Sequence, residues 1–166
     1  MGWQVHDTWL STAAVNGTPD LSIFQPFKSV NRNVIVELVR TWFVFATPSS
    51  SLALTNLTMQ IYSNDVAGGN VPGHLLATST SLWTKAQLIT DDYGVIGVPF
   101  AFTDFLARKN DLYHLVPKTT GYTGTSTSNI GWRKGYPDPT YRSGLTLDYA
   151  GQLTYPRMVS IFGKQL

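Results

Sequence analysis

The segment Val34–Phe45 is the part of this sequence that most constrains the fold. It consists largely of β-branched and aromatic residues, which are the side chains that fit the pleated surface of a strand. Val34, Val36 and Leu38 recur at every second position and therefore fall on one face, while the pattern changes near Arg40, where the register of the strand can shift. We predict a long strand over this segment, the strongest strand of the chain.

Shorter strand-like segments occur along the rest of the chain, separated by turns rich in Gly, Pro, Asn and Asp. Residues 57–62 alternate between apolar and polar side chains, residues 103–106 fit one helical turn or a wide loop, and Pro117 is expected to end a strand. The remaining predicted strands cover residues 21–29, 75–80, 95–102, 112–116, 130–133, 145–147 and 158–163. No segment has the pattern of a long amphipathic helix, so the sequence predicts an all-β sandwich or barrel.

The length of 166 residues is enough for one domain with a full hydrophobic core. We assign residues 21–166 to this domain and residues 1–20 to an N-terminal arm, in which Trp3 and Trp9 are mixed with polar spacers. Tryptophans in an irregular segment are expected to be buried against the domain or against a neighbouring subunit. Trp3 and Trp9 are therefore candidates for an assembly interface.

The composition argues against several classes of function. Charged residues make up 13% of the chain, roughly half the usual share of a soluble domain, and the net charge is +2. The basic residues form no stripe, which argues against nucleic-acid binding, and no apolar run is long enough to span a membrane. The absence of cysteine excludes disulfides, thiol nucleophiles and thiolate metal sites. With no signal-peptide pattern at the N-terminus, we expect synthesis in a reducing cytoplasm.

The sequence contains no catalytic or metal-binding constellation of histidines or nucleophiles. No histidine is paired with another ligand at metal-ligand spacing, and His114 alternates with core residues, which favours a place on the face of a strand. Neither a nucleophile elbow nor a phosphate-binding loop is present. We therefore expect no enzymatic activity, no metal and no cofactor.

The ten acidic residues fit turns better than active sites. Most of them lie beside Gly, Asn or Pro, so a pair of carboxylates arranged for glycoside cleavage is not expected. Asp65, Asp91 and Asp92 offer loop oxygens that could bind calcium. The favoured interpretation is that these side chains cap backbone groups in turns.

Aromatic side chains gather in and beside the long loops of the second half of the chain. The aromatic residues are Tyr122, Trp132, Tyr136 and Tyr141. They could stack on sugar rings, with hydrogen bonds supplied by Asn129, Asp138 and Arg142. The alternative, which we favour, is that these aromatics wedge the loops into the sandwich or fill a subunit interface.

A series of motifs occurs in a fixed order between residues 34 and 147. In order they are Ile61-Tyr62-Ser63-Asn64-Asp65, Gly68-Gly69, Pro72-Gly73-His74-Leu75-Leu76-Ala77-Thr78-Ser79, Val98-Pro99-Phe100-Ala101-Phe102, Leu112-Tyr113-His114-Leu115-Val116, Ile130-Gly131-Trp132 and the Tyr-Pro loop of residues 136–144. This series resembles a jelly-roll module of bacterial surface proteins and of tail, fibre and capsid proteins of bacterial viruses. Neither the arm nor the segment after Tyr149 is explained by the resemblance.

The resemblance implies a single jelly-roll-type antiparallel β-sandwich, of a family that has no catalytic residues in common. It also implies a non-enzymatic structural protein of a bacteriophage virion, either a capsid decoration (cement) protein or the head of a fibre, made in the host cytoplasm. The expected partners are major capsid or tail proteins, and the chain itself is expected to form a homotrimer. The alternative is a carbohydrate-binding or host-receptor-binding module of a tail fibre or surface protein, with a surface glycan as its ligand at the aromatic loops.

Overall fold

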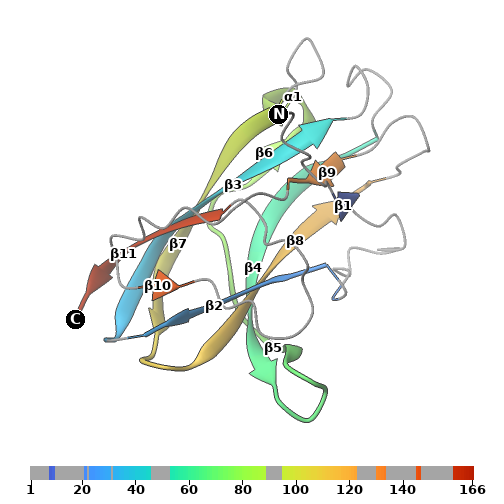
Figure 1. Cartoon of the computed structure of the whole chain (residues 1–166). Helices are drawn as coiled ribbons and strands as arrows, with labels where there is room; N and C mark the ends of the chain where they lie inside the picture. The colour runs from blue at the N-terminus through green and yellow to red at the C-terminus, as the bar shows by residue number, and fades with distance from the viewer. Residues whose placement is uncertain are drawn as a thin grey trace, which may run out of the picture.

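Two antiparallel β-sheets pack face to face in this protein (Figure 1). The computed structural model describes residues 8–9, 21, 23–30, 32–45, 53–88, 95–122, 130–133, 145–146 and 159–166. The elements are β1 (Thr8–Trp9), β2 (Gln25–Ser29), β3 (Val34–Phe45), β4 (Asn56–Asp65), β5 (Val71–Thr78), β6 (Trp83–Thr84), α1 (Lys85–Leu88), β7 (Val95–Ala107), β8 (Leu112–Thr120), β9 (Ile130–Trp132), β10 (Leu145–Thr146) and β11 (Val159–Gln165).

Strand β3 is the centre of the five-stranded sheet, which we call sheet A. Residues 34–41 of β3 pair with β7 on one side and with β11 on the other. Residues 43–45 pair with β9, which in turn pairs with β1. The six-stranded sheet B has the order β10-β2-β8-β4-β5, with β6 beside the start of β4.

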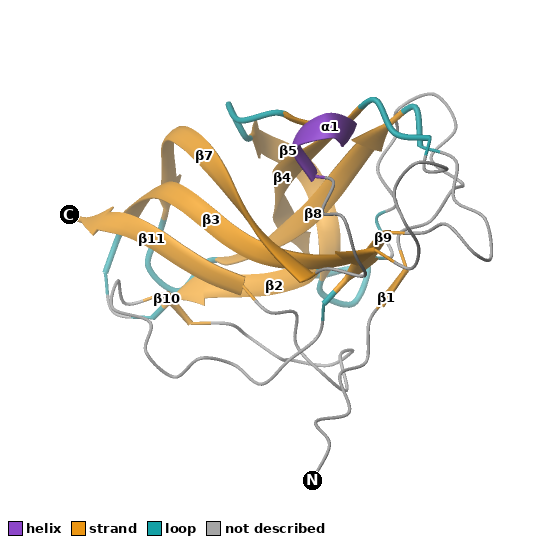
Figure 2. Cartoon of the chain, turned by 90° about the horizontal axis from the view of Figure 1, so that it is seen from above, coloured by secondary structure: helices purple, strands orange, loops and turns teal. Residues whose placement is uncertain are grey.

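The connections confirm the predicted antiparallel sandwich. The chain changes sheets from β2 to β3, from β3 to β4, and at each step from β6 to β11, whereas β4, β5 and β6 follow one another within sheet B (Figure 2). The strand predicted at Val34–Phe45 is confirmed to the residue. Within the predicted arm, Thr8 and Trp9 pair with Trp132 and Gly131, so this part of the arm extends sheet A.

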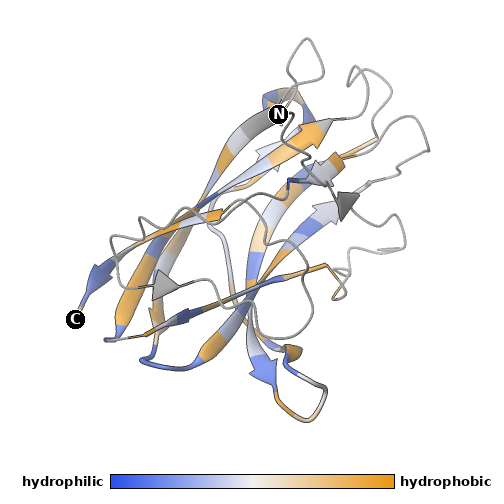
Figure 3. Ribbon diagram, in the orientation of Figure 1, coloured by the Kyte–Doolittle hydropathy of each residue, from blue (hydrophilic) through white to orange (hydrophobic). Residues whose placement is uncertain are grey.

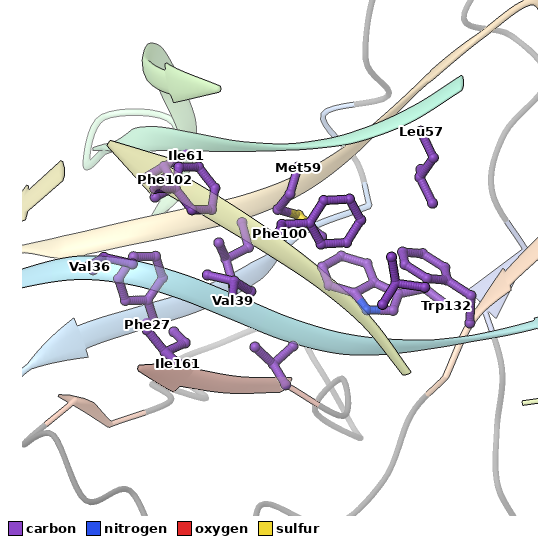
Figure 4. Close-up of a cluster of buried hydrophobic side chains, with 14 of the residues drawn as sticks. Phe27, Val36, Val39, Leu57, Met59, Ile61, Phe100, Phe102, Trp132 and Ile161 are labelled. Carbon is purple, nitrogen blue, oxygen red and sulfur yellow. The ribbon is translucent and has the colours of Figure 1, made fainter. Parts of the chain in front are cut away.

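The hydrophobic core lies between the two sheets. Hydrophobic and hydrophilic residues are interspersed along the strands, as expected when one face of each strand is buried (Figure 3). Met59 of β4 points toward the Phe100 ring of β7 across the gap between the sheets (Figure 4). The largest fully buried hydrophobic side chains are Trp132, Phe27, Phe43, Phe100, Leu57, Met59, Ile61, Leu88, Leu115 and Ile130. Each contributes roughly 1.5–3 kcal/mol by leaving water.

A bulge at Glu37 corrects the predicted face of β3. Both ladders skip Glu37. Relative to β11, β3 has one extra residue, because Val36 and Leu38 pair with the adjacent residues Gly163 and Phe162, whereas on β7 the three residues 102–104 lie unpaired opposite Glu37. Such an extra residue changes the phase of the side-chain alternation. Val36 is buried in the core and so is Val39, whereas Leu38 points to the outer face. The prediction that Leu38 shares a face with Val34 and Val36 is therefore wrong.

Two further expectations about local structure are corrected. Strand β8 runs through Pro117 to Thr120, so Pro117 does not end it. The ladder between β8 and β2 ends at Leu115, so at Pro117 strand β8 pairs with β4 alone. Proline is tolerated in a strand that has a neighbour on just one side, because its missing N–H is not needed there. Residues 103–106, predicted as a helical turn or a loop, belong to β7, where Asp104 has φ 50° at an irregularity of the ladder with β3.

Gly163 is expected to be required at the bulge, because it lies opposite Val36 and a Cβ there would collide with the carbonyl oxygen of Ile35. We expect Gly163→Ala to lower the free energy of unfolding by roughly 1–3 kcal/mol, measured by urea denaturation. The control is Ser160→Ala on the same strand, with an expected change within about 0.5 kcal/mol. Equal stability of the two variants would contradict the assignment of the bulge.

Candidate binding surface

Trp132 and Tyr122 are the predicted ligand-binding aromatics that the structure describes, and the Trp132 side chain is in the core. It is fully buried, its indole N–H donates to Thr41 Oγ1 at 2.6 Å, and its ring stacks on Phe43 with a centroid distance of 6.3 Å. Tyr122 is buried as well, and its hydroxyl accepts a hydrogen bond from the backbone N–H of Ile130. These two positions fit the alternative in which the aromatics pack the fold rather than stack on sugars.

The remaining predicted site residues cannot be placed. Trp3, Tyr136, Asp138, Tyr141 and Arg142 lie outside the described residues, and Trp9 is described only through the backbone pairing of β1. Their roles in ligand binding and assembly therefore stay predictions.

Asp65 caps a turn in the hairpin between β4 and β5. Its Oδ1 accepts the backbone N–H of Gly68 at 3.1 Å, and the turn continues through Gly69 and Asn70, both with positive φ. Asp65 therefore caps a backbone group in a turn, as predicted. Asp91 and Asp92 lie outside the described residues. In the described part of the chain, no group of three or more His, Asp or Glu side chains could hold a metal ion.

His114 is a buried titratable group on β8. Its Nε2 lies 2.8 Å from Asn64 Oδ1, and Asn64 Nδ2 in turn donates to Asn70 Oδ1 at 2.9 Å, which orients the Asn64 amide so that Nε2 carries the proton. Phe24 presents its ring edge-on at 5.0 Å. The Nδ1 atom is buried and has no hydrogen-bond partner. Burial lowers the pKa of His114 from 6.5 to about 4.

The outer face of sheet A presents an aromatic ring and a guanidinium side by side. The Arg40 guanidinium carbon lies 5.4 Å from the centre of the Trp42 ring, within the range of a cation–π contact. Arg40 is exposed and Trp42 is half-buried. Gly97, directly opposite Trp42 on β7, leaves space for both, because a Cβ there would lie 2.9 Å from Arg40 Nε and 3.1 Å from Trp42 Nε1. Glycine at 97 therefore lets the guanidinium lie close to the sheet.

An apolar row lies next to Arg40 on the same face. Leu38 is directly opposite Phe162 on β11, and 50% of Phe162 is exposed. On the other side of Leu38 lies Ala101 of β7. We call Glu37, Leu38, Arg40, Trp42 and Phe162 the outer patch. Its mixture of Trp, Arg, Phe and Leu is typical of the anchor residues of protein interfaces.

The charges of the outer patch stand on opposite sides of the Leu38–Phe162 pair. Arg40 lies on one side, with uncharged cross-strand neighbours in Pro99 and Ser160. The exposed Glu37 lies on the other side, in the bulge. The sequence does not indicate this patch, because simple alternation along the strand predicts Leu38 on the same face as Val34. A glycine at position 97 within a predicted strand was the available signal, since such a glycine often marks a close approach.

The edges of the sandwich are less suited to binding than the outer patch. On β7, the indole N–H of Trp83 donates to the carbonyl of Pro99, and the N–H of Thr80 donates to the carbonyl of Ala101. These bonds use backbone groups that an added strand would need. The last strand of sheet B, β5, exposes Leu75, but two register shifts in its ladder with β4 interrupt the regular edge.

Comparison with known proteins gives little similarity. No family model matches the chain, and no curated protein matches it. Among solved structures, it is similar to a CocE/NonD family hydrolase from Staphylococcus aureus, with 12% sequence identity and a TM-score of 0.36. The match covers 98% of this chain but 37% of the hydrolase, and similarity at this level does not indicate a shared activity. Among the described helices, none has the length and apolar character needed to cross a bilayer.

Trp132→Ala is expected to lower the free energy of unfolding by roughly 3–5 kcal/mol, because it removes a fully buried ring and its hydrogen bond to Thr41. Thermal or denaturant unfolding measures the loss. The matched control is Trp42→Ala, which removes the half-buried tryptophan of the outer face and should cost much less. A Trp132→Ala variant as stable as the native chain would contradict the core position.

His114 is expected to make stability fall as the pH drops from 6.5 to about 4. In that window the unfolded chain binds a proton at His114 and the folded chain does not, so protonation favours unfolding. The free energy of unfolding is unaffected by His114 above pH 6.5, and it falls by about 3 kcal/mol between pH 6.5 and pH 4. Denaturant unfolding at several pH values measures it. His114→Gln should flatten the profile in this window, and an unchanged slope would refute the assignment.

Proposed function

We propose that this protein is a non-enzymatic structural protein of a bacteriophage virion, acting as a capsid decoration protein or as the head of a fibre. The supporting observation is the outer patch, in which Phe162 is half-exposed and Arg40 makes a cation–π contact with Trp42. The chain as a whole is poor in charged residues. A partner that covers such a surface removes its apolar side chains from water, which stabilises the complex. Bound to a shell, the protein stabilises the assembled state by mass action.

The mechanism follows from the rigidity of the sandwich. Strands of a packed sheet hold the outer patch in one arrangement, and the contact of Arg40 with Trp42 further restricts the guanidinium. A surface that is already ordered loses little conformational entropy on binding. The protein therefore adds interface area between shell subunits without first having to rearrange.

Particle association tests this proposal. We expect the chain to be detected by mass spectrometry in purified virus particles and the purified protein to co-sediment with particles that lack it. Arg40→Glu should reduce co-sedimentation at least tenfold, because it reverses the charge of the outer patch. The control is Arg108→Glu, the same change at an exposed residue away from the patch. A protein absent from particles, or one that never binds them, refutes the virion role.

A second candidate is a carbohydrate-binding or host-receptor-binding module. The observation that favours it is the half-buried ring of Trp42 beside Arg40, on which a sugar ring could stack. Trp132 offers no such surface, because its ring is fully buried. A glycan array tests this candidate: it gains support if the native protein binds surface glycans and Trp42→Ala loses that binding while remaining folded, and it is refuted if the native protein binds none.

A further inference from the structure

The centre of the outer patch is apolar. Leu38 and Phe162 face each other across β3 and β11, and half of the Phe162 side chain is exposed. Their neighbours Ala101 and Ser160 are small, so they leave the ring and the leucine accessible. A large aromatic side chain exposed on the face of a sheet is stabilised when a partner removes it from water.

The charges on either side of this centre do not pair with each other within one chain. Arg40 and Glu37 are three positions apart along β3, which separates their Cα atoms by roughly 10 Å. Among the described residues, neither forms an ion pair, and Arg40 contacts Trp42 instead. Asp104, also exposed, lies in the irregular part of β7 that faces the bulge at Glu37, so acids gather at this end of the patch.

We propose that two copies of this chain associate face to face through the outer patch, about a two-fold axis near Leu38 and Phe162, with Arg40 of each copy facing Glu37 of the other. A two-fold axis brings one surface against itself, so each contact occurs twice. A surface with a positive group on one side of its apolar centre and a negative group on the other is complementary to itself. A partner that offered charges of one sign would leave Arg40 or Glu37 opposite a like charge.

Gly97 and Trp42 prepare Arg40 for this contact. The guanidinium lies against the Trp42 ring in the space that a side chain at position 97 would occupy. A guanidinium held in this way can donate two hydrogen bonds to a carboxylate with little further loss of freedom. The contact area of a few strand residues is small for a protein interface, so we expect a dissociation constant on the order of micromolar.

The association is tested by sedimentation equilibrium of the purified protein over a range of concentrations, without particles or other proteins. The native chain should form a concentration-dependent dimer. Arg40→Glu and Glu37→Arg should each weaken the dimer at least tenfold, because each places like charges opposite one another. The double variant Arg40→Glu/Glu37→Arg should restore the dimer, since the pair is reversed in both copies. Circular dichroism checks that every variant is folded.

The control is Arg108→Glu, which makes the same charge change outside the patch and should leave the dimer unchanged. The proposal is overturned by a native chain that stays monomeric into the millimolar range, or by a double variant no better than the single ones. A trimer, as the family resemblance implies, that is insensitive to these substitutions overturns it too. The second copy covers the same outer patch that the proposed function assigns to a shell subunit, so the dimer is the state of the free protein and the two contacts exclude each other. Because the measurement is made in solution, its failure is independent of whether the protein occurs in virions.

Discussion

The bulge at Glu37 determines what both faces of sheet A present. Relative to β11, β3 has one extra residue, Glu37, and beyond it Val39, Thr41 and Phe43 lie in the core. The same shift turns Leu38, Arg40 and Trp42 outward. Because the side-chain period of a strand is two, one extra residue is enough to exchange the whole set between core and solvent. The core packing and the candidate binding surface are therefore two consequences of one irregularity.

The core face of β3 makes a buried side-chain hydrogen bond to β9 within an otherwise apolar environment. Thr41 and Trp132 are both fully buried, and the hydrogen bond between them satisfies the indole N–H that would otherwise be costly to bury. Phe43, next on the same face, stacks on the indole and meets Phe100 edge-to-face. This arrangement explains why a tryptophan in a glycine-rich part of the sequence belongs to the core and is unavailable to a ligand.

Sequence periodicity predicted most strands, because alternation of apolar and polar residues directly reflects one buried face. It failed where the structure departs from simple alternation. Alternation predicts the wrong face for Leu38, because it does not reveal the bulge at Glu37. Proline predicts the end of a strand at Pro117, but β8 continues there with β4 as its one neighbour. At Asp104 a positive φ inside β7 was mistaken for a loop. The pattern of aromatics in and beside loops predicts ligand contacts, but both of the aromatics that the structure describes, Tyr122 and Trp132, are buried, because periodicity in short segments does not report exposure.

The sequence by itself determined that this chain forms antiparallel strands around an apolar core, because β-branched and aromatic residues at period two have few other ways to leave water. It also determined the lack of thiol chemistry and the low charge of the surface. Only the tertiary structure decided which aromatic side chains are buried and which are exposed. That decision depends on strand register, and register is set by contacts between residues far apart in the chain, such as Phe162 opposite Leu38 and Gly97 opposite Trp42.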